Sequence, residues 1–397
     1  MKWRMRAIVD TKALSRFQME EKVGIITSYL DFDKNYGGVL QGYALSKIIS
    51  SLGYTPYIMP YVYQHITDEK ISFVHRLLRS VRKKCTCAIN SSKRNQNKSF
   101  RNIKRFVDER LPIYPQKTTT IDDLKDLSKD FHAFVCGSDQ VWNVRLQRNH
   151  CDPGMFLSFV PDGIKRIAYA PSLGSTTSIG GELVEEFQNA IARFHSISVR
   201  ERGGQDLIMK TTGRFAPIVL DPTLLMPLEW WNDFLETPEQ LPPKYILLYR
   251  FGSDMESTDR SIVEAQRKYG LPIIELPSSA KSLTDGYTKR YDIDPAQFIG
   301  IIKNASLVLT DSFHCTVFCI LMRTQFLTFY RQSPEMQNNM NDRVDDLLQM
   351  TQLTSRLIKP GMELVTQPIS EGEFSRAYLE IAERKKASLT YLREALK

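Results

Sequence analysis

Residues 22–62 read KVGIITSYLDFDKNYGGVLQGYALSKIISSLGYTPYIMPYV, and the pattern of apolar residues changes twice within them. The apolar run at 23–27 is typical of a buried strand. Apolar residues then recur with helical spacing from Val39 to Leu52, and Gly53 is placed to end that helix. A second short apolar run follows. The sequence therefore predicts a strand–helix–strand unit of a parallel sheet.

The same alternation of strand and helix patterns continues along the chain. Before the proline-rich break ETPEQLPPK, buried strands are expected at 131–137, 165–171, 196–201 and 216–222. After the break they are expected at 244–252, 271–277, 306–310 and 325–330. We therefore predict an α/β protein with two Rossmann-like domains that face each other across a cleft. The predicted bounds are 20–230 and 240–368 for the domains and 369–397 for a C-terminal helix.

The composition is that of a globular protein, with 42% hydrophobic and 25% charged residues in a chain of 397. No apolar run approaches the roughly 18 residues of a membrane span, and the N-terminus has no signal-peptide pattern, so we expect a cytoplasmic protein. None of the six cysteines belongs to a pair of CxxC motifs with zinc-like spacing. Cys315 and Cys319 lie in an apolar run, which favours buried thiols. We expect no disulfide and no metal.

Positive charge is concentrated in one segment. Residues 70–105 contain twelve Lys or Arg and no Asp or Glu, and because the formal net charge is +8, the rest of the chain has a charge of −4. No recognised module or aromatic stacking pattern accompanies this basic insertion, so nucleic acid is disfavoured. Leu77, Leu78 and Val81 share one helical side among basic residues, which suits a membrane surface. We expect 76–105 to bind an anionic membrane, the alternative being a solvated helical insertion.

Polar residues and glycines follow the first predicted strand and open the first helix. Asn35, Gly37 and Gly38 leave backbone N–H groups uncovered at the positive end of the helix dipole, which favours a bound anion. The motif is not GxGxxG, so a dinucleotide is disfavoured. The alternative is that these glycines only permit a tight turn.

A second polar turn, GSDQVWN, follows the next predicted strand. It contains Ser138, Asp139, Gln140, Trp142 and Asn143. Carboxylate and amide groups hydrogen-bond sugar hydroxyls, and an indole ring stacks on a sugar ring. These five residues are therefore candidates for binding a sugar, and the alternative is a structural polar turn.

Two further strand ends provide an arginine and a histidine. SVRERGG ends a predicted strand in Arg200 and Arg202, of which we prefer Arg200 for the site. The planar guanidinium fork suits a carboxylate or a phosphate. His314 lies in the polar turn DSFHCT between a predicted strand and helix. A lone histidine is more often structural, but its place at a strand end favours a catalytic or ligand-binding role.

Six motifs together resemble the polysaccharide pyruvyl transferase family. They are, in chain order, NYGGVLQGYAL, VCGSDQVWN, YAPSLG, SVRERGG, VLDPTLLM and LTDSFHCTVFCILM, within about Val23 to about Leu348. The resemblance implies a glycosyltransferase-B-like pair of Rossmann-type domains. It also implies transfer of pyruvate from phosphoenolpyruvate onto two hydroxyls of one sugar as a cyclic ketal, with release of phosphate. The donor-contacting positions of the family match Arg200 and His314.

One position departs from the family pattern. Many members have an arginine two residues before the histidine, where this chain has Ser312. Ser312 is therefore expected at the donor site without the charge, and another cation is expected to replace it. The candidates are Arg250, Lys303, Arg323 and Arg343, and Arg343 is included in the predicted donor site.

The resemblance and the residues suggest the same chemistry. Phosphoenolpyruvate is the expected co-substrate and no cofactor is expected. His314 is the predicted acid or base because its side chain titrates near neutral pH, and Asp139 is predicted to orient or deprotonate an acceptor hydroxyl. The expected acceptor is a sugar of a capsule or exopolysaccharide repeat on a lipid diphosphate, at the inner membrane face. The alternatives are a nucleotide-sugar glycosyltransferase and an inactive sugar-binding subunit, the latter suggested by Ser312.

Overall fold

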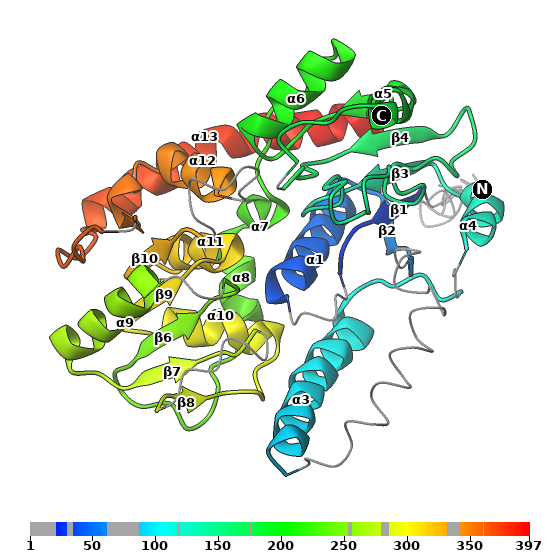
Figure 1. Ribbon diagram of the computed structural model, residues 1–397. Helices are drawn as coiled ribbons and strands as arrows, with labels where there is room; N and C mark the ends of the chain where they lie inside the picture. The colour runs from blue at the N-terminus through cyan, green and yellow to red at the C-terminus, as the bar shows by residue number, and fades with distance from the viewer. Residues whose placement is uncertain are drawn as a thin grey trace, which may run out of the picture.

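The chain forms two α/β domains, each built on a parallel sheet, in a computed structural model (Figure 1). The predicted two-domain α/β fold is thereby confirmed. The structure describes residues 21–29, 35–61, 87–116, 120–174, 176–252, 256–278, 286–331, 341–359 and 361–397.

The N-terminal sheet has the strand order β2-β1-β3-β4-β5. Its strands are β1 (Lys22–Ile26), β2 (Thr55–Ile58), β3 (Ala133–Cys136), β4 (Lys165–Ala168) and β5 (Ser196–Ile197). Helix α1 (Tyr36–Ser51) joins β1 to β2, which pair in parallel with Val23 opposite Pro56. The strand–helix–strand unit predicted at the start of the chain is therefore confirmed. Further helices in the described part of this domain are α3 (Cys87–Arg110), α4 (Ile121–Ser128), α5 (Glu182–Ala192) and α6 (Arg202–Thr212).

The C-terminal sheet has the strand order β11-β10-β9-β6-β7-β8. Its strands are β6 (Ile246–Tyr249), β7 (Ile273–Glu275), β8 (Thr288–Lys289), β9 (Leu307–Thr310), β10 (Phe326–Phe329) and β11 (Leu357–Ile358). The helices of this half are α9 (Glu256–Tyr269), α10 (Pro295–Lys303), α11 (Phe313–Leu321), α12 (Asp342–Met350) and the short 3₁₀ turn Thr354–Arg356.

One predicted strand is absent. The stretch 216–222 forms only a single bridge, between Ile218 and Val199, and then enters α7 (Pro222–Leu225). Pro217 has no N–H to donate to a sheet, and Asp221 caps α7 through a hydrogen bond from Thr223 N. The strand prediction at 216–222 was therefore wrong, and the segment instead turns Asp221 toward the domain interface.

The strand order of each sheet indicates where a ligand is expected. In each sheet the chain reverses its direction of strand addition, between β1 and β3 in the first and between β6 and β9 in the second. Open α/β sheets bind ligands outside the carboxyl ends of the strands at this switch point. The loops that follow these four strands are therefore the first places to look for a site.

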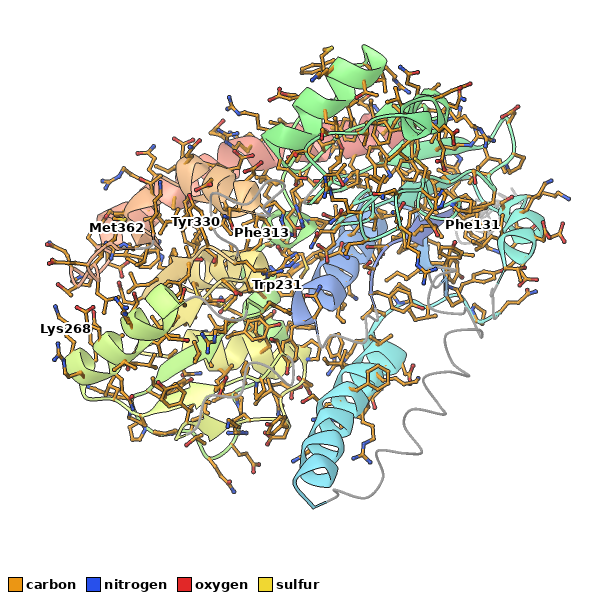
Figure 2. The ribbon with its side chains drawn as sticks, in the orientation of Figure 1. Phe131, Trp231, Lys268, Phe313, Tyr330 and Met362 are labelled. Atoms are coloured by element: carbon orange, nitrogen blue, oxygen red, sulfur yellow. The ribbon has the colours of Figure 1, made fainter. Side chains whose placement is uncertain are left out.

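An apolar interface joins the domains. Tyr36, at the start of α1, stacks on Phe298 of α10 with ring centroids 4.6 Å apart and donates a hydrogen bond to the Ile293 carbonyl at 3.1 Å. Trp231, on the connecting helix α8 (Leu228–Phe234), packs edge-on against Phe318 of α11. Figure 2 shows Trp231 and Phe313 near the middle of the molecule. The two domains therefore share one core and present a defined interface.

Helix α13 (Glu371–Leu396) braces both domains (Figure 1). It begins with a capping box in which Ser370 and Glu373 bond each other's backbone. Near its start, the Tyr378 hydroxyl donates to the Leu321 carbonyl of the C-terminal domain. Near its end, Tyr391 donates to the Ala168 carbonyl of the N-terminal domain at 3.0 Å. The predicted C-terminal helix thus spans the domain interface.

Part of the predicted basic insertion lies outside the described residues. Leu77, Leu78, Val81 and the basic residues among them fall there, and the described helix α3 begins at Cys87. Two α3 side chains bond the C-terminal domain, because Ser99 and Asn102 donate to backbone carbonyls in the segment that precedes α10. No described helix combines the length and hydropathy needed to cross a bilayer.

Candidate functional site

Arg200 lies between two carboxylates at the domain interface. Its Nη1 donates to Asp221 Oδ2 at 2.8 Å, and its Nη2 donates to Asp139 Oδ1 at 3.4 Å. The guanidinium also lies over the Phe313 ring, 4.6 Å from the centroid, and only 6% of Arg200 is exposed. Burial lowers the pKa of Arg200, but the surrounding carboxylates raise it by more, so the side chain stays charged.

Asp221 joins the two domains. Its Oδ1 accepts from the backbone N and the hydroxyl of Thr223, while its Oδ2 accepts from Arg200 and lies 3.3 Å from His314 Nε2. Burial raises the pKa of Asp221, but His314 and Arg200 lower it by more, and the net pKa lies well below that of an ordinary aspartate. Ionised Asp221 can only accept a hydrogen bond. The His314 ring nitrogen that faces it, Nε2, therefore has a proton.

His314 enters the N-terminal domain next to a glycine. It lies in the first turn of α11, which Ser312 caps by accepting from Cys315 N. A Cβ placed on Gly37 would lie 2.1 Å from His314 Nδ1. Glycine at this position therefore permits the imidazole to pack against the start of α1 and reach Asp221.

The N-terminus of α1 has fewer free backbone N–H groups than predicted. Asn35 caps α1 by accepting from Gly38 N at 3.1 Å, and its amide donates to Asp139 Oδ2 at 3.4 Å. The Gly38 N–H is therefore already bonded, and Gly37 faces His314. Asn35 and Gly37 thus contact Asp139 and His314, and the predicted contact of these residues with an anion stays a prediction.

The predicted sugar-binding turn is mostly part of the N-terminal core. Trp142 is fully buried, stacks on Phe156, and donates from Nε1 to the Met155 carbonyl. Asn143 is also fully buried and donates to Gln140 Oε1 at 2.9 Å. Neither side chain has a face open to a sugar in this structure, which differs from the prediction.

Two members of the turn point toward the site. The Ser138 hydroxyl lies 2.8 Å from the Ala170 carbonyl and 3.2 Å from Asp221 Oδ2, and it can donate its one hydrogen to either. Asp139 bonds Arg200 and Asn35. Burial raises the pKa of Asp139, whereas Arg200 and His314 lower it by more, so this carboxylate is ionised as well. Its predicted role toward an acceptor hydroxyl stays a prediction.

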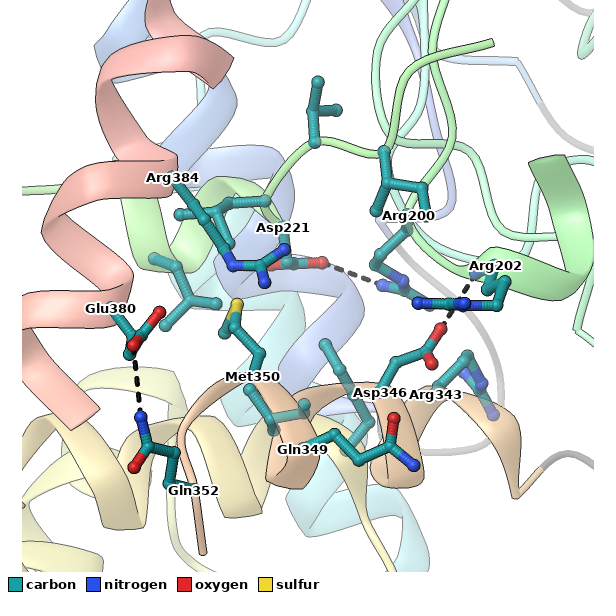
Figure 3. Close-up of a pocket in the computed structure, with 16 residues that line it drawn as sticks. Arg200, Arg202, Asp221, Arg343, Asp346, Gln349, Met350, Gln352, Glu380 and Arg384 are labelled. Atoms are coloured by element: carbon teal, nitrogen blue, oxygen red, sulfur yellow. Dashed lines mark hydrogen bonds and ion pairs between the residues drawn. The ribbon is translucent and has the colours of Figure 1, made fainter. Parts of the chain in front are cut away.

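A cavity of about 240 Å³ opens beside this network, between the loop after β5, α7 and α11 on one side and α12 and α13 on the other (Figure 3). Of the residues predicted from sequence, Arg200 and Arg343 line it. His314 and Asp139 lie behind its wall, which Asp221 and Phe313 form in front of them. The predicted arginines are thus brought together, and the histidine reaches the cavity through Asp221.

Arg343 is a buried cation that no other described residue pairs with. It is 7% exposed, its Nε is buried, and no hydrogen bond or ion pair to it exists among the described residues. Burial lowers the pKa of Arg343 to about 10, and the nearby Arg200 and Arg331 act in the same direction. A buried unpaired charge is costly, so this position favours an anionic ligand.

The other three candidate cations are engaged elsewhere. Arg250 pairs with Asp259, Arg323 pairs with Glu371, and Lys303 donates to Asn232 at 3.0 Å. None of them lines the 240 Å³ cavity. Of the four, Arg343 alone faces Arg200 there.

The second switch point is filled by the chain itself. The Asp311 carboxylate accepts from Phe251 N at 2.8 Å and from Gly252 N at 2.6 Å, just after β6. The adjacent cavity is about 10 Å³, room for about one water molecule. A carboxylate therefore occupies the backbone N–H groups that a phosphate would use at this strand end.

Sequence reasoning missed Asp221, Glu201 and Phe313. Asp221 lies at the end of a predicted strand, just before Pro222. A strand end is also the position that favoured His314, so the sequence contains a signal for Asp221. Glu201 accepts from Leu173 N and lies 3.7 Å from Arg200 Nε, which sequence alone does not reveal. No set of three or more His, Cys, Asp or Glu suited to a metal occurs in the part of the chain that the structure describes.

Comparison with known proteins gives one family and distant structural neighbours. A family model described as "Polysaccharide pyruvyl transferase" matches residues 35–333. No curated protein matches the chain. Solved structures similar to it include UDP-GlcNAc 2-epimerase of Methanocaldococcus jannaschii in complex with UDP-GlcNAc and UDP, at 14% identity over 92% of this chain and 99% of that chain, with a TM-score of 0.41.

Two other solved structures have similar values. MurG of Acinetobacter baumannii is 10% identical over 95% of this chain and 94% of that chain, with a TM-score of 0.41. The glycosyltransferase SnogD of Streptomyces nogalater is 10% identical over 95% of this chain and 99% of that chain, with a TM-score of 0.46.

The contact between Gly37 and His314 predicts a site-specific cost for a methyl group. In Gly37→Ala the new Cβ overlaps an imidazole that Asp221 holds in place, so we expect a loss of about 1–3 kcal/mol in the free energy of unfolding. Gly42→Ala, on the same helix, is the control, because its Cβ meets only ordinary contacts from 3.6 Å. Urea denaturation measures both. Equal stability of the two variants would contradict the contact.

The buried Glu201 predicts a pH effect. Burial raises the pKa of Glu201 above its usual value, although Arg200 and Arg343 act in the opposite direction. Between the ordinary and the raised pKa the folded protein binds more protons than the unfolded chain, so this residue lowers the free energy of unfolding as pH rises. Glu201→Gln, which mimics the protonated form, should become more stable relative to wild type from pH 5 to pH 8. Thermal denaturation across this range checks it, and a constant difference would contradict it.

Proposed function

The chain belongs to the polysaccharide pyruvyl transferase family, and on this basis we propose that it transfers pyruvate from phosphoenolpyruvate onto two hydroxyls of one sugar, forming a cyclic ketal and releasing phosphate. The observation that supports this donor most directly is Arg343, which is buried beside Arg200 in the interdomain cavity and is not paired with any residue of the described part of the chain. The acceptor in this proposal is a sugar of a polysaccharide repeat.

The cavity suits a small dianion or trianion. Phosphoenolpyruvate has a carboxylate and a phosphate, and each matches the planar fork of a guanidinium. Arg200 and Arg343 supply two guanidinium groups to the lining of one cavity, from its opposite sides, and no described residue pairs with that of Arg343.

In the proposed reaction the donor gains a proton at its methylene carbon, which becomes a methyl group. Protonated His314 supplies this proton in the proposal, and ionised Asp221, which forms the cavity wall, stabilises the imidazolium. A sugar hydroxyl attacks the central carbon, and the phosphate leaves with the electrons of its C–O bond. A second hydroxyl then attacks the same carbon and closes the ring. Of the two hydroxyl protons released, one replaces the proton of His314 and the other leaves with phosphate.

Arg200 and Arg343 act together in this scheme. Both balance the charge of the donor, and both stabilise the additional negative charge that develops on phosphate as its C–O bond breaks. The scheme requires no cofactor. Attachment of 76–105 to an anionic membrane, and a lipid-diphosphate-linked acceptor at the cytoplasmic face, remain predictions.

The first test is donor binding. Phosphoenolpyruvate should raise the melting temperature of the wild type, because a ligand at 100 times its Kd stabilises the folded state by about 2.7 kcal/mol. Arg343→Gln should lose this shift. Arg323→Gln should keep it, since Arg323 is exposed and paired with Glu371. Differential scanning fluorimetry with phosphoenolpyruvate and UDP-GlcNAc measures both. A shift with UDP-GlcNAc alone would establish the glycosyltransferase alternative.

The second test is the proton-transfer group. His314→Ala should lower the rate of phosphate release from phosphoenolpyruvate by about 10²–10⁴ while keeping the donor-induced melting shift. His150→Ala is the control, because that histidine is exposed and paired with Glu186. The assay uses galactose-, mannose- and N-acetylmannosamine-containing acceptors. Retention of half the activity in His314→Ala would remove the residue from the mechanism.

A further inference from the structure

The interdomain cavity has two chemically different ends (Figure 3). One end gathers Arg200, Arg202 and Arg343, and two of these arginines are buried. The other end is formed by Gln352 at the end of α12 and by Glu380 and Arg384 on α13, and Asp221 and Met350 lie between the two groups.

The second end has the composition of a sugar site. Gln352 and Arg384 are exposed and Glu380 is half-buried, so these side chains line the side that is open to solvent. They provide amide, guanidinium and carboxylate groups, which together donate to and accept from sugar hydroxyls. The half-buried Met350 adds an apolar surface for a ring face. Gln352 already donates to Glu380 Oε1 at 3.1 Å, which fixes the two side chains relative to each other.

The charges at the two ends are arranged differently. Glu380 and Arg384 balance each other at the α13 end, whereas at the other end Asp221 and Asp139 bind Arg200, and Arg202 and Arg343 have only Asp346 as a further carboxylate in the cavity lining. A donor with a phosphate and a carboxylate is therefore drawn to Arg202 and Arg343. A neutral sugar is better served by the amide of Gln352 and the balanced Glu380 and Arg384.

We propose that the acceptor sugar binds at the open end, between α12 and α13, with Gln352, Glu380 and Arg384 as its polar contacts. The inference rests on the proposed function and assigns the second substrate of that site. A sugar that is part of a longer chain must extend into solvent, and this end of the cavity permits it. The predicted alternative around Trp142 offers no accessible ring.

The arrangement also explains how both substrates meet. Asp221 lies between the arginine end and the α13 end and is hydrogen bonded to His314. A donor held by Arg200 and Arg343 and a sugar held by Glu380 thus approach the same carboxylate from opposite sides. When the sugar is bound at this end, its hydroxyls face the donor.

The test is saturation-transfer-difference NMR on the full chain in the presence of phosphoenolpyruvate. The probes are the methyl glycosides of galactose, mannose and N-acetylmannosamine. At least one should bind the wild type, and its Kd should rise at least tenfold when Glu380→Ala and Gln352→Ala are combined. Glu383→Ala is the control, because that α13 carboxylate is exposed and paired with Lys386. Glu380→Gln is a second, conservative variant and should weaken binding less.

Three outcomes decide the question. Unchanged sugar binding in the double variant would overturn the assignment. So would the absence of binding by all three probes to a wild type whose melting temperature phosphoenolpyruvate raises. If phosphoenolpyruvate fails to raise that temperature, the proposed function fails, and the acceptor assignment fails with it.

Discussion

The hydrogen bonds of the Asp221 carboxylate connect the two domains at the site. Arg200, from the N-terminal domain, and His314, from the C-terminal domain, both meet the same oxygen, at 2.8 Å and 3.3 Å. Asp221 is 1% exposed, so these contacts replace the water it lost on folding. The position of His314 depends in turn on Gly37, where any side chain would collide with the ring. The same contacts therefore fix both the geometry of the site and the packing of the two domains against each other.

Among the residues that the structure describes, none pairs with Arg343, which lies beside this network. Burying ions is costly, and the cost falls when each ion is paired and hydrogen bonded. Asp221, Asp139 and Arg200 meet that condition, whereas Arg343 does not. An anion beside Arg343 and Arg200 completes the network, so ligand binding and stability are linked through the same residues. The occupied N–H groups at Asp311 leave the arginine cavity as the larger of the two anion-accepting positions.

Local patterns predicted the fold and part of the site. The first strand and helix, and the place of Arg200 and His314 after strands, follow from periodicity and strand ends. The strand-end position of Asp221 was a usable signal, but its contact with His314, 93 residues away, is revealed only by the assembled domains. Trp142 misled because the composition of a turn does not show whether an indole faces a ligand or the core. Arg343 was one of four candidate cations that spacing does not rank.

The most direct test of the account is a crystal structure of the protein grown with phosphoenolpyruvate. The account predicts one donor molecule between the domains, with carboxylate and phosphate oxygens within hydrogen-bond distance of the Arg200 and Arg343 guanidinium groups. A donor bound instead at the N–H groups of Phe251 and Gly252, with the Asp311 carboxylate displaced, would contradict it. So would a donor bound with Arg343 still unpaired.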